Sequence, residues 1–163
     1  MAKQDTPMTR GVRLLLDRKV QFGVHLYPYE AHGGTSNAAT SLGVPEHAVI
    51  KTLVMEAEGG RPFLVLMHGD REVSTKNLAR ALGVKAVAPC PVEKAERVTG
   101  YQVGGISPFG TRQPMAVYVE ESILALERIY VNGGKRGFLV EIAPNDLKSI
   151  LTTVHEVQVA IVP

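Results

Sequence analysis

Two apolar segments separated by a glycine-containing turn place the strongest constraint on how this chain can fold. Residues 50–56 and 62–68 are mostly apolar, and Glu58-Gly59-Gly60 lies between them. A short turn with two glycines between two such runs is typical of a β-hairpin. The chain is therefore predicted to form a sheet that contains this pair of strands.

Helical and strand patterns alternate irregularly over the rest of the chain, and short turns join several strands. This favours an α+β fold with a mixed sheet over a strictly repeating α/β fold. We predict a single domain over residues 1–163, because this is the length of one ordinary domain. Helices are predicted from a cap at Thr6-Pro7, over 35–42, after Ser74, over 91–98 and near 147–151, and further strands over 21–27, 85–88, 101–103, 115–120, 128–131, 138–142 and 157–162.

Net charge and cysteine content exclude several classes of protein. The formal net charge is only +2, so the chain does not coat nucleic acid through bulk positive charge, and contact with RNA should be local. A single cysteine excludes a disulfide framework and fits a reducing cytosol. No signal peptide and no bilayer-spanning apolar run is evident. We therefore expect a cytoplasmic protein with neither a membrane nor DNA as a partner.

Searches for general catalytic motifs name no reaction. The sequence has neither a Walker A loop nor a Gly-x-Gly-x-x-Gly segment that opens a helix, and its five histidines lack metal-ligand spacing on any one element. We expect no metal and no cofactor. Cys90 lies between two prolines without an evident histidine partner, so it is predicted to be a small buried residue rather than a nucleophile.

Lys51 is the first of three features that indicate a functional site. It lies in the first strand of the hairpin, where alternation places it on one face with Leu53 and Met55. Neither face of this strand is plainly polar, so Lys51 can point into the floor of a pocket. The alternative is that Lys51 lies at the strand end and extends its amine to water.

The second feature is the glycine-rich loop over residues 101–110. Gly104 and Gly105 allow the backbone to approach a ligand closely, and Ser107-Pro108 fixes the next turn. Exposed N–H groups in such a loop can hold a carbonyl oxygen as it becomes an oxyanion. The alternative is a bulge and a tight turn between two strands.

The third feature is the loop over residues 132–137, which reads Asn-Gly-Gly-Lys-Arg-Gly. Its backbone can form a nest for an anion, with Lys135 and Arg136 facing a phosphate. The alternative is a plain hairpin loop that carries two cations at its tip.

These three features, in this order, resemble the YbaK/EbsC family of aminoacyl-tRNA deacylases, which is related to the editing domain of bacterial prolyl-tRNA synthetases. The matching segments are residues 49–53, 99–110 and 129–137, and the resemblance continues over nearly the whole chain. Within the family, the sequence looks most like the Cys-tRNA(Pro) deacylases. The resemblance implies an α+β domain with a mixed, barrel-like twisted sheet, surrounding helices and a pocket at one side.

The resemblance also implies roles for individual residues. Lys51 matches the family's essential lysine, which helps to hold the 3′-terminal adenosine and to organise the ester. The loop around Gly105 and Ser107 matches a family loop that borders the aminoacyl group, so these two residues and Lys51 are the expected catalytic residues. The expected substrate-binding residues are Tyr27, Gly104, Ile106, Pro108, Asn132, Gly133, Gly134 and Lys135.

The chain departs from the family's pattern at three places. Asn132 stands where serine is frequent, Leu139 stands near a frequent acidic position, and residues 32–35 (His-Gly-Gly-Thr) stand where a bulky or acidic residue is common. These differences affect the expected size of the pocket, and hence which amino acid is removed. They leave Lys51 and the glycine loops unchanged.

The activity implied by the resemblance is deacylation of mischarged Cys-tRNA(Pro) at the tRNA 3′ end, with Cys-tRNA(Cys) as a further substrate. In the family's substrate-assisted route, the cysteine thiol attacks its own carbonyl and forms a thiolactone, so the enzyme supplies positioning and charge. The alternatives are water attack on Ala-tRNA(Pro), a non-catalytic module that binds tRNA or a synthetase, and a nucleotide-binding protein. Prolyl-tRNA synthetase is the candidate protein partner.

Overall fold

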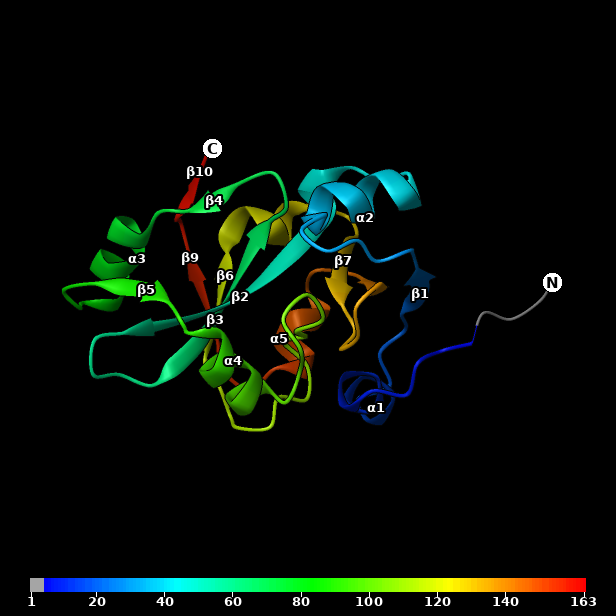
Figure 1. Cartoon of the computed structure of the whole chain (residues 1–163), viewed down its shortest axis with the longest axis horizontal. Helices are drawn as coiled ribbons and strands as arrows, with labels where there is room; N and C mark the ends of the chain where they lie inside the picture. Colours follow the sequence, from blue (N-terminus) through cyan, green and yellow to red (C-terminus); the bar gives the residue numbers. More distant parts are fainter. Residues whose placement is uncertain (1–4) are drawn as a thin grey trace.

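A mixed β-sheet runs through the centre of the molecule, with helices packed around it (Figure 1). The computed structural model describes residues 5–163. The helices are α1 (Arg10–Asp17), α2 (Gly34–Leu42), α3 (Thr75–Leu82), α4 (Val92–Thr99) and α5 (Asp146–Ile150), with 3₁₀ segments η1 (Glu46–Ala48) and η2 (Glu121–Ala125). The strands are β1 (Gly23–Leu26), β2 (Val49–Ala57), β3 (Pro62–His68), β4 (Glu72–Val73), β5 (Val87–Pro89), β6 (Val117–Glu120), β7 (Ile129–Asn132), β8 (Phe138–Ile142), β9 (Val154–Val157) and β10 (Ala160–Ile161).

The main sheet has the strand order β1-β8-β7-β2-β3-β6-β9, and β5 pairs with part of β2. The predicted hairpin is confirmed as the antiparallel pair β2–β3, which lies in the middle of this order. Parallel pairs join β2 to β7, β3 to β6 and β6 to β9, whereas β1–β8 and β7–β8 are antiparallel. The predicted α+β class with a mixed sheet is therefore confirmed.

Apolar side chains cover both faces of the central hairpin. In β3, Leu64 and Leu66 pack into one cluster while Val65 and Met67 pack into another, and all four side chains are fully buried. Burial of each such side chain stabilises the fold by about 1.5–3 kcal/mol. This is why neither face of the hairpin reads as polar in the sequence, and it holds β2 firmly between two apolar layers.

Local chemistry at the helix ends follows the sequence closely. Ser74 caps α3 by accepting a hydrogen bond from the Asn77 N–H, and Gly83 ends this helix in the left-handed conformation. The predicted start of the first helix is wrong, because Thr9 rather than Thr6 caps α1 through a hydrogen bond from the Val12 N–H. Thr9 is favoured because its hydroxyl also reaches the carbonyl of Gly133, far away in the sequence.

Three strand predictions also need correction. Residues 101–103 form turns instead of a strand, because Tyr101 uses its hydroxyl to donate to the Phe109 carbonyl and closes a compact loop. The predicted strand over 157–162 is divided between the end of β9 and β10, which joins β4 in a separate two-stranded sheet. The strand predicted at 85–88 is shifted to Val87–Pro89, where it pairs with β2.

None of the helices formed within residues 5–163 has the length and apolar character needed to cross a bilayer.

His68, at the end of β3, is almost completely buried and connects two short helical segments. Its Nδ1–H donates to the His47 carbonyl in η1 at 2.8 Å, and its Nε2 lies 2.7 Å from the Ser122 hydroxyl in η2. A carbonyl oxygen can only accept, so Nδ1 carries the proton. In the neutral ring, Nε2 competes with the Glu120 Oε2, which lies 3.0 Å from the Ser122 Oγ, for the one proton of that hydroxyl. Burial lowers the pKa of His68, which favours this neutral form in the folded protein.

We predict that the free energy of unfolding falls as the pH decreases below about 6.5, the ordinary pKa of histidine. Below this pH the His68 side chain binds a proton in the unfolded chain but stays neutral in the folded protein, because its folded-state pKa is lowered. The contribution of His68 to the free energy of unfolding is therefore fully present above this pH and is lost as the pH falls through the lowered pKa. Urea unfolding between about pH 5 and 8 measures this. The variant His68→Gln should show a flatter dependence, and an unchanged slope would contradict the assignment.

Candidate functional site

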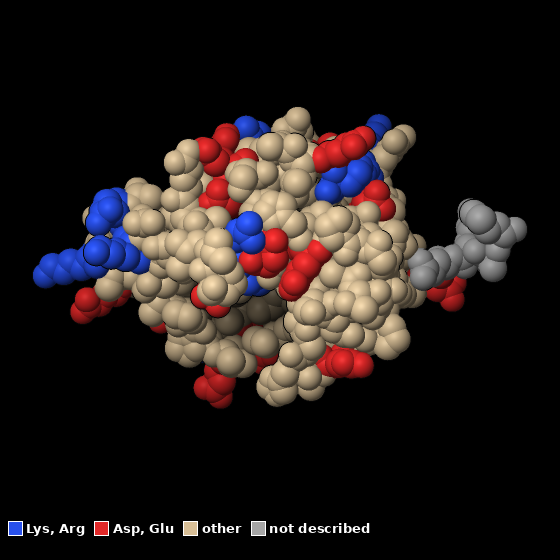
Figure 2. Space-filling model, turned by 90° about the horizontal axis from the view of Figure 1, so that it is seen from above, with Lys and Arg blue, Asp and Glu red and all other residues tan. Residues whose placement is uncertain are grey.

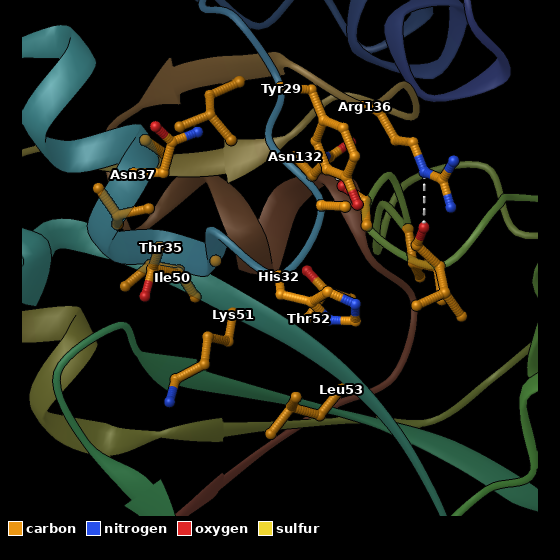
Figure 3. Close-up of a pocket in the computed structure, with 18 of the residues that line it drawn as sticks. Tyr29, His32, Thr35, Asn37, Ile50, Lys51, Thr52, Leu53, Asn132 and Arg136 are labelled. Carbon is orange, nitrogen blue, oxygen red and sulfur yellow. Dashed lines mark hydrogen bonds between the residues drawn. The ribbon is translucent and has the colours of Figure 1, made fainter.

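A cavity of about 810 Å³ opens beside β2. This volume falls in the range of about 300–1,000 Å³ that is usual for small-molecule sites. Five parts of the chain line it: the segment from Tyr27 into α2, the strand β2, the segment from Cys90 into α4, the loop around Gly104, and the β7–β8 loop with Asn132 and Arg136 (Figure 3). Segments far apart in the sequence therefore meet around one hollow.

The cavity lies where one edge of β2 has no strand partner. On the β3 side, β2 is paired from Ile50 to Glu56. On its other edge, β7 pairs only with Val49 and Ile50, and β5 begins to pair only at Met55. Among residues 5–163, the β2 segment 51–53 therefore has no strand on this edge, and the cavity occupies the gap.

Thr52 lies in the middle of this gap and has three polar groups without a protein partner on that side. The Val54 carbonyl accepts from the Cys90 N–H on the same edge. Alternate residues of a strand direct their peptide groups to the same edge, so the Thr52 N–H and C=O also point into the gap. The Thr52 hydroxyl is buried and forms no hydrogen bond within the described residues. A polar ligand can therefore bind here through these three groups.

Lys51 is half-buried and lines the same cavity. In Figure 3 its side chain lies on the same side of β2 as Leu53, while Ile50 and Thr52 point to the other side. Within residues 5–163, Lys51 forms no ion pair. Lys51 thus lies in the lining of the cavity without a carboxylate partner among these residues, and its catalytic role stays a prediction.

Asn132 uses both ends of its side-chain amide inside the protein. Its Oδ1 accepts from the backbone N–H groups of Gly134 (2.7 Å) and Lys135 (3.1 Å), and its Nδ2 donates to the Gly104 carbonyl at 3.3 Å. The amide therefore shapes the β7–β8 loop and ties it to the loop around Gly104. Leu139, on the next strand, is almost fully buried and packs against Val49 and Ala38, so an apolar side chain forms this part of the wall.

Close approach between loops depends on two adjacent glycines. A Cβ on Gly104 would lie 2.6 Å from the Tyr29 hydroxyl, and Gly104 has a φ of +92°. A Cβ on Gly105 would lie 2.7 Å from the Arg136 backbone nitrogen. The Gly105 N–H already donates to the Gln102 carbonyl at 2.8 Å. The glycines thus allow their own loop to pack against the segment that carries Tyr29 and against the β7–β8 loop. The Gly105 N–H is occupied within its own turn.

The expected site residues fall into two groups in the structure. Those that line the cavity are Tyr27, Lys51, Gly104, Ile106 and Asn132. Those that lie outside its lining are Gly105, Ser107, Pro108, Gly133, Gly134 and Lys135. Ser107 is fully buried, and its Oγ accepts from the Phe109 N–H at 3.1 Å. The geometry therefore gives Ser107 and Gly105 a supporting position behind the wall, and their roles in catalysis stay predictions.

The lining residues that were not among the expected site residues include Tyr29, His32 and Thr52. His32 is exposed and has a φ of +63°, a left-handed conformation that is uncommon for a residue other than glycine. Its ring lies in the middle of the cavity, near Thr52 (Figure 3). The sequence analysis related residues 32–35 to the size of the pocket but did not give the direction of the imidazole.

The titratable groups at the cavity favour neutral forms at two positions. Burial, with a smaller contribution from Tyr29, raises the pKa of Tyr27, so its hydroxyl remains protonated at neutral pH. Burial and the nearby Glu56 raise the pKa of Cys90, which also lines the cavity. Cys90 is therefore held as a thiol, and a thiol is a poor nucleophile.

Charge on the surface is mixed. Figure 2 shows lysine and arginine side chains at one end of this face and at several places across it, acidic side chains interspersed with them, and a hollow near the middle. Within residues 5–163, no three His, Cys, Asp or Glu side chains gather closely enough to hold a metal ion.

Comparison with known proteins identifies relatives of nearly the whole chain. A family model described as "Aminoacyl-tRNA editing domain" matches residues 31–150. A protein of Enterococcus faecalis named "Putative Cys-tRNA(Pro)/Cys-tRNA(Cys) deacylase EbsC" is 32% identical over 152 residues, which cover 92% of this chain and 93% of that protein. A proline–tRNA ligase of Brachyspira hyodysenteriae is 30% identical over 86 residues, which cover 53% of this chain and 15% of the ligase.

A solved structure shares the fold. The crystal structure of "a putative trans-editing enzyme for prolyl tRNA synthetase" aligns with 91% of this chain and 94% of that chain, with a TM-score of 0.76 and 23% sequence identity.

We predict that Gly105→Ala destabilises the protein by about 1–3 kcal/mol, the usual cost of overpacking. The added Cβ meets backbone atoms of Lys135 and Arg136, which cannot rotate away as a side chain does. Thermal unfolding measures the effect. Gly60→Ala is the matched control, because its Cβ meets Ala57 at an ordinary 3.4 Å. Equal melting temperatures for the two variants would show that the loops are not tightly packed.

Proposed function

The chain belongs to the family of aminoacyl-tRNA editing domains, and we propose that it removes cysteine from mischarged Cys-tRNA(Pro). As an editing enzyme, it hydrolyses the ester between an amino acid and the 3′-terminal ribose of tRNA. We extend the proposal to Cys-tRNA(Cys), because the name of the Enterococcus relative includes both substrates.

The observation that carries this proposal is the cavity at the unpaired edge of β2, which offers a cation and polar donors but no activated nucleophile. Lys51 has no ion-pair partner among residues 5–163, and the Thr52 N–H points into the gap. Cys90 is kept as a thiol by its raised pKa. Such a site is suited to a reaction in which the substrate supplies the nucleophile and the protein supplies position and charge.

In the proposed reaction, the sulfur of the cysteinyl group attacks its own ester carbonyl. A carbon–sulfur bond forms, the carbon–oxygen ester bond breaks, and the thiol proton ends on the released ribose hydroxyl. The products are free tRNA and a cysteine thiolactone, which water then opens. We assign to Lys51 the stabilisation of negative charge on the ester oxygens, and to the Thr52 N–H the role of a fixed donor to the carbonyl oxygen.

This chemistry supplies the selectivity that pocket size alone lacks. One methylene group in an apolar pocket is worth only about 1–3 kcal/mol. Alanine and proline lack a thiol, so they enter the cavity without completing the reaction.

We also propose prolyl-tRNA synthetase as the partner, since a proline–tRNA ligase contains a segment similar to this chain. The mixed charge in Figure 2 fits weak binding of tRNA by this protein alone.

We predict that Lys51→Ala lowers the rate of cysteine release by about 10²–10³-fold, the effect of losing one charge-stabilising donor. Release of labelled amino acid from Cys-tRNA(Pro) measures this, with Cys-tRNA(Cys), Ala-tRNA(Pro) and Pro-tRNA(Pro) assayed alongside. Lys148→Ala is the control, because Lys148 is exposed and pairs with Glu156 outside the cavity.

Full activity of Lys51→Ala would remove Lys51 from the mechanism. Faster release of alanine than of cysteine by the unmodified protein would overturn the thiol-assisted route. No release from any of the four substrates would favour a non-catalytic binding module.

His32 supports a second candidate, water attack on Ala-tRNA(Pro). Its imidazole lies in the cavity and can act as a general base, a contribution usually worth about 10²–10⁴-fold. On this alternative, His32→Ala lowers the rate of alanine release by that factor and leaves the rate of cysteine release nearly unchanged. Assays of both substrates with this variant decide the point, and equal small effects on both would eliminate His32 as the base.

A further inference from the structure

Arg136 joins two other loops at one end of the cavity. Its Nε–H donates to the Val103 carbonyl at 2.9 Å, and its guanidinium carbon lies 5.1 Å from the centre of the Tyr29 ring. Figure 3 shows this arrangement, with the side chain held between Tyr29 and the Val103 carbonyl. The guanidinium is thus fixed in position before any ligand binds, which reduces the entropy lost on binding.

The terminal amines of this guanidinium remain available. A guanidinium has five N–H donors, and the described contacts of Arg136 use only the one on Nε. Within residues 5–163, Arg136 forms no ion pair, although Glu30 also lines the cavity. A fixed, unpaired cation at a cavity rim with free parallel donors matches the geometry of a phosphate group.

We propose that the terminal amines of Arg136 bind the phosphate on the 5′ side of the substrate's terminal nucleotide. This rests on the proposed function, because it places the ester near Lys51 and Thr52. In Figure 3, Lys51 and Arg136 lie at opposite ends of the set of labelled residues, with His32 between them. In this arrangement the terminal nucleotide spans the cavity, with its ester near Lys51 and its phosphate at Arg136. These two contacts fix the orientation of the ester.

Neighbouring Lys135 has a different position. Both side chains are exposed, but Lys135 lies outside the cavity lining, whereas Arg136 lines the cavity and contacts Val103 and Tyr29. Of the two adjacent cations, Arg136 is therefore the one that the structure directs at a bound nucleotide.

The test measures binding of two small probes, adenosine and adenosine 5′-monophosphate, by NMR titration of the whole protein. We expect the phosphate to tighten binding about tenfold in the unmodified protein, as one good charge-assisted contact does. In Arg136→Ala this gain should fall below about twofold, while binding of adenosine changes little. The ratio of the two affinities separates phosphate recognition from a loss of loop packing, which weakens both probes equally.

Two further variants sharpen the test. Arg136→Lys keeps the charge but loses the planar fork and the hydrogen bond to Val103, so it should retain only part of the phosphate gain. Arg80→Ala removes an exposed arginine of α3 outside the cavity lining, and the full tenfold gain should remain.

The same phosphate gain in Arg136→Ala as in the unmodified protein, or no gain in the unmodified protein, would overturn the proposal. Because the probes carry no aminoacyl ester, these outcomes are independent of deacylation. Failure of the proposed function instead appears as no release of amino acid from tRNA, whatever the probes show.

Discussion

The incomplete pairing of β2 is the constraint on which the site depends. The strand is paired with β3 from Ile50 to Glu56, but its other edge is covered by β7 at one end and by β5 at the other. The peptide groups left between them lie beside a cavity instead of a strand. A buried polar group without a partner costs about 1–3 kcal/mol, so this edge favours any ligand that supplies hydrogen bonds. Apolar clusters lie on both faces of the β2–β3 hairpin and bury its strands.

The wall opposite β2 is built by loops that pack closely because two of their positions are glycine. Gly104 and Gly105 allow the segments that carry Tyr29 and Arg136 to approach within contact distance. Asn132 and Arg136 then fasten the loops through their polar atoms. The wall is consequently organised before a substrate enters, which is what a site needs when its contribution is positioning.

Charge at the cavity is arranged for an anionic, ester-bearing ligand. Both lining cations, Lys51 and Arg136, lack an ion-pair partner within residues 5–163, and the hydroxyl of Tyr27 and the thiol of Cys90 are held neutral. The absence of a carboxylate at Leu139 makes that part of the wall apolar. The cavity therefore combines two cations with a partly apolar wall.

The sequence by itself determined the elements whose causes are local. The glycine turn between β2 and β3, the Ser74 cap and the stop at Gly83 each depend on residues within one or two turns of the chain. The sequence also placed Lys51 on one face of its strand with Leu53, because side chains alternate along a strand. Only the tertiary structure decided that Thr52 faces an unpaired edge, that Ser107 lies behind the wall, and that Arg136 reaches Tyr29. These facts depend on contacts between residues far apart in the sequence, and no local pattern encodes where β7 ends relative to β5.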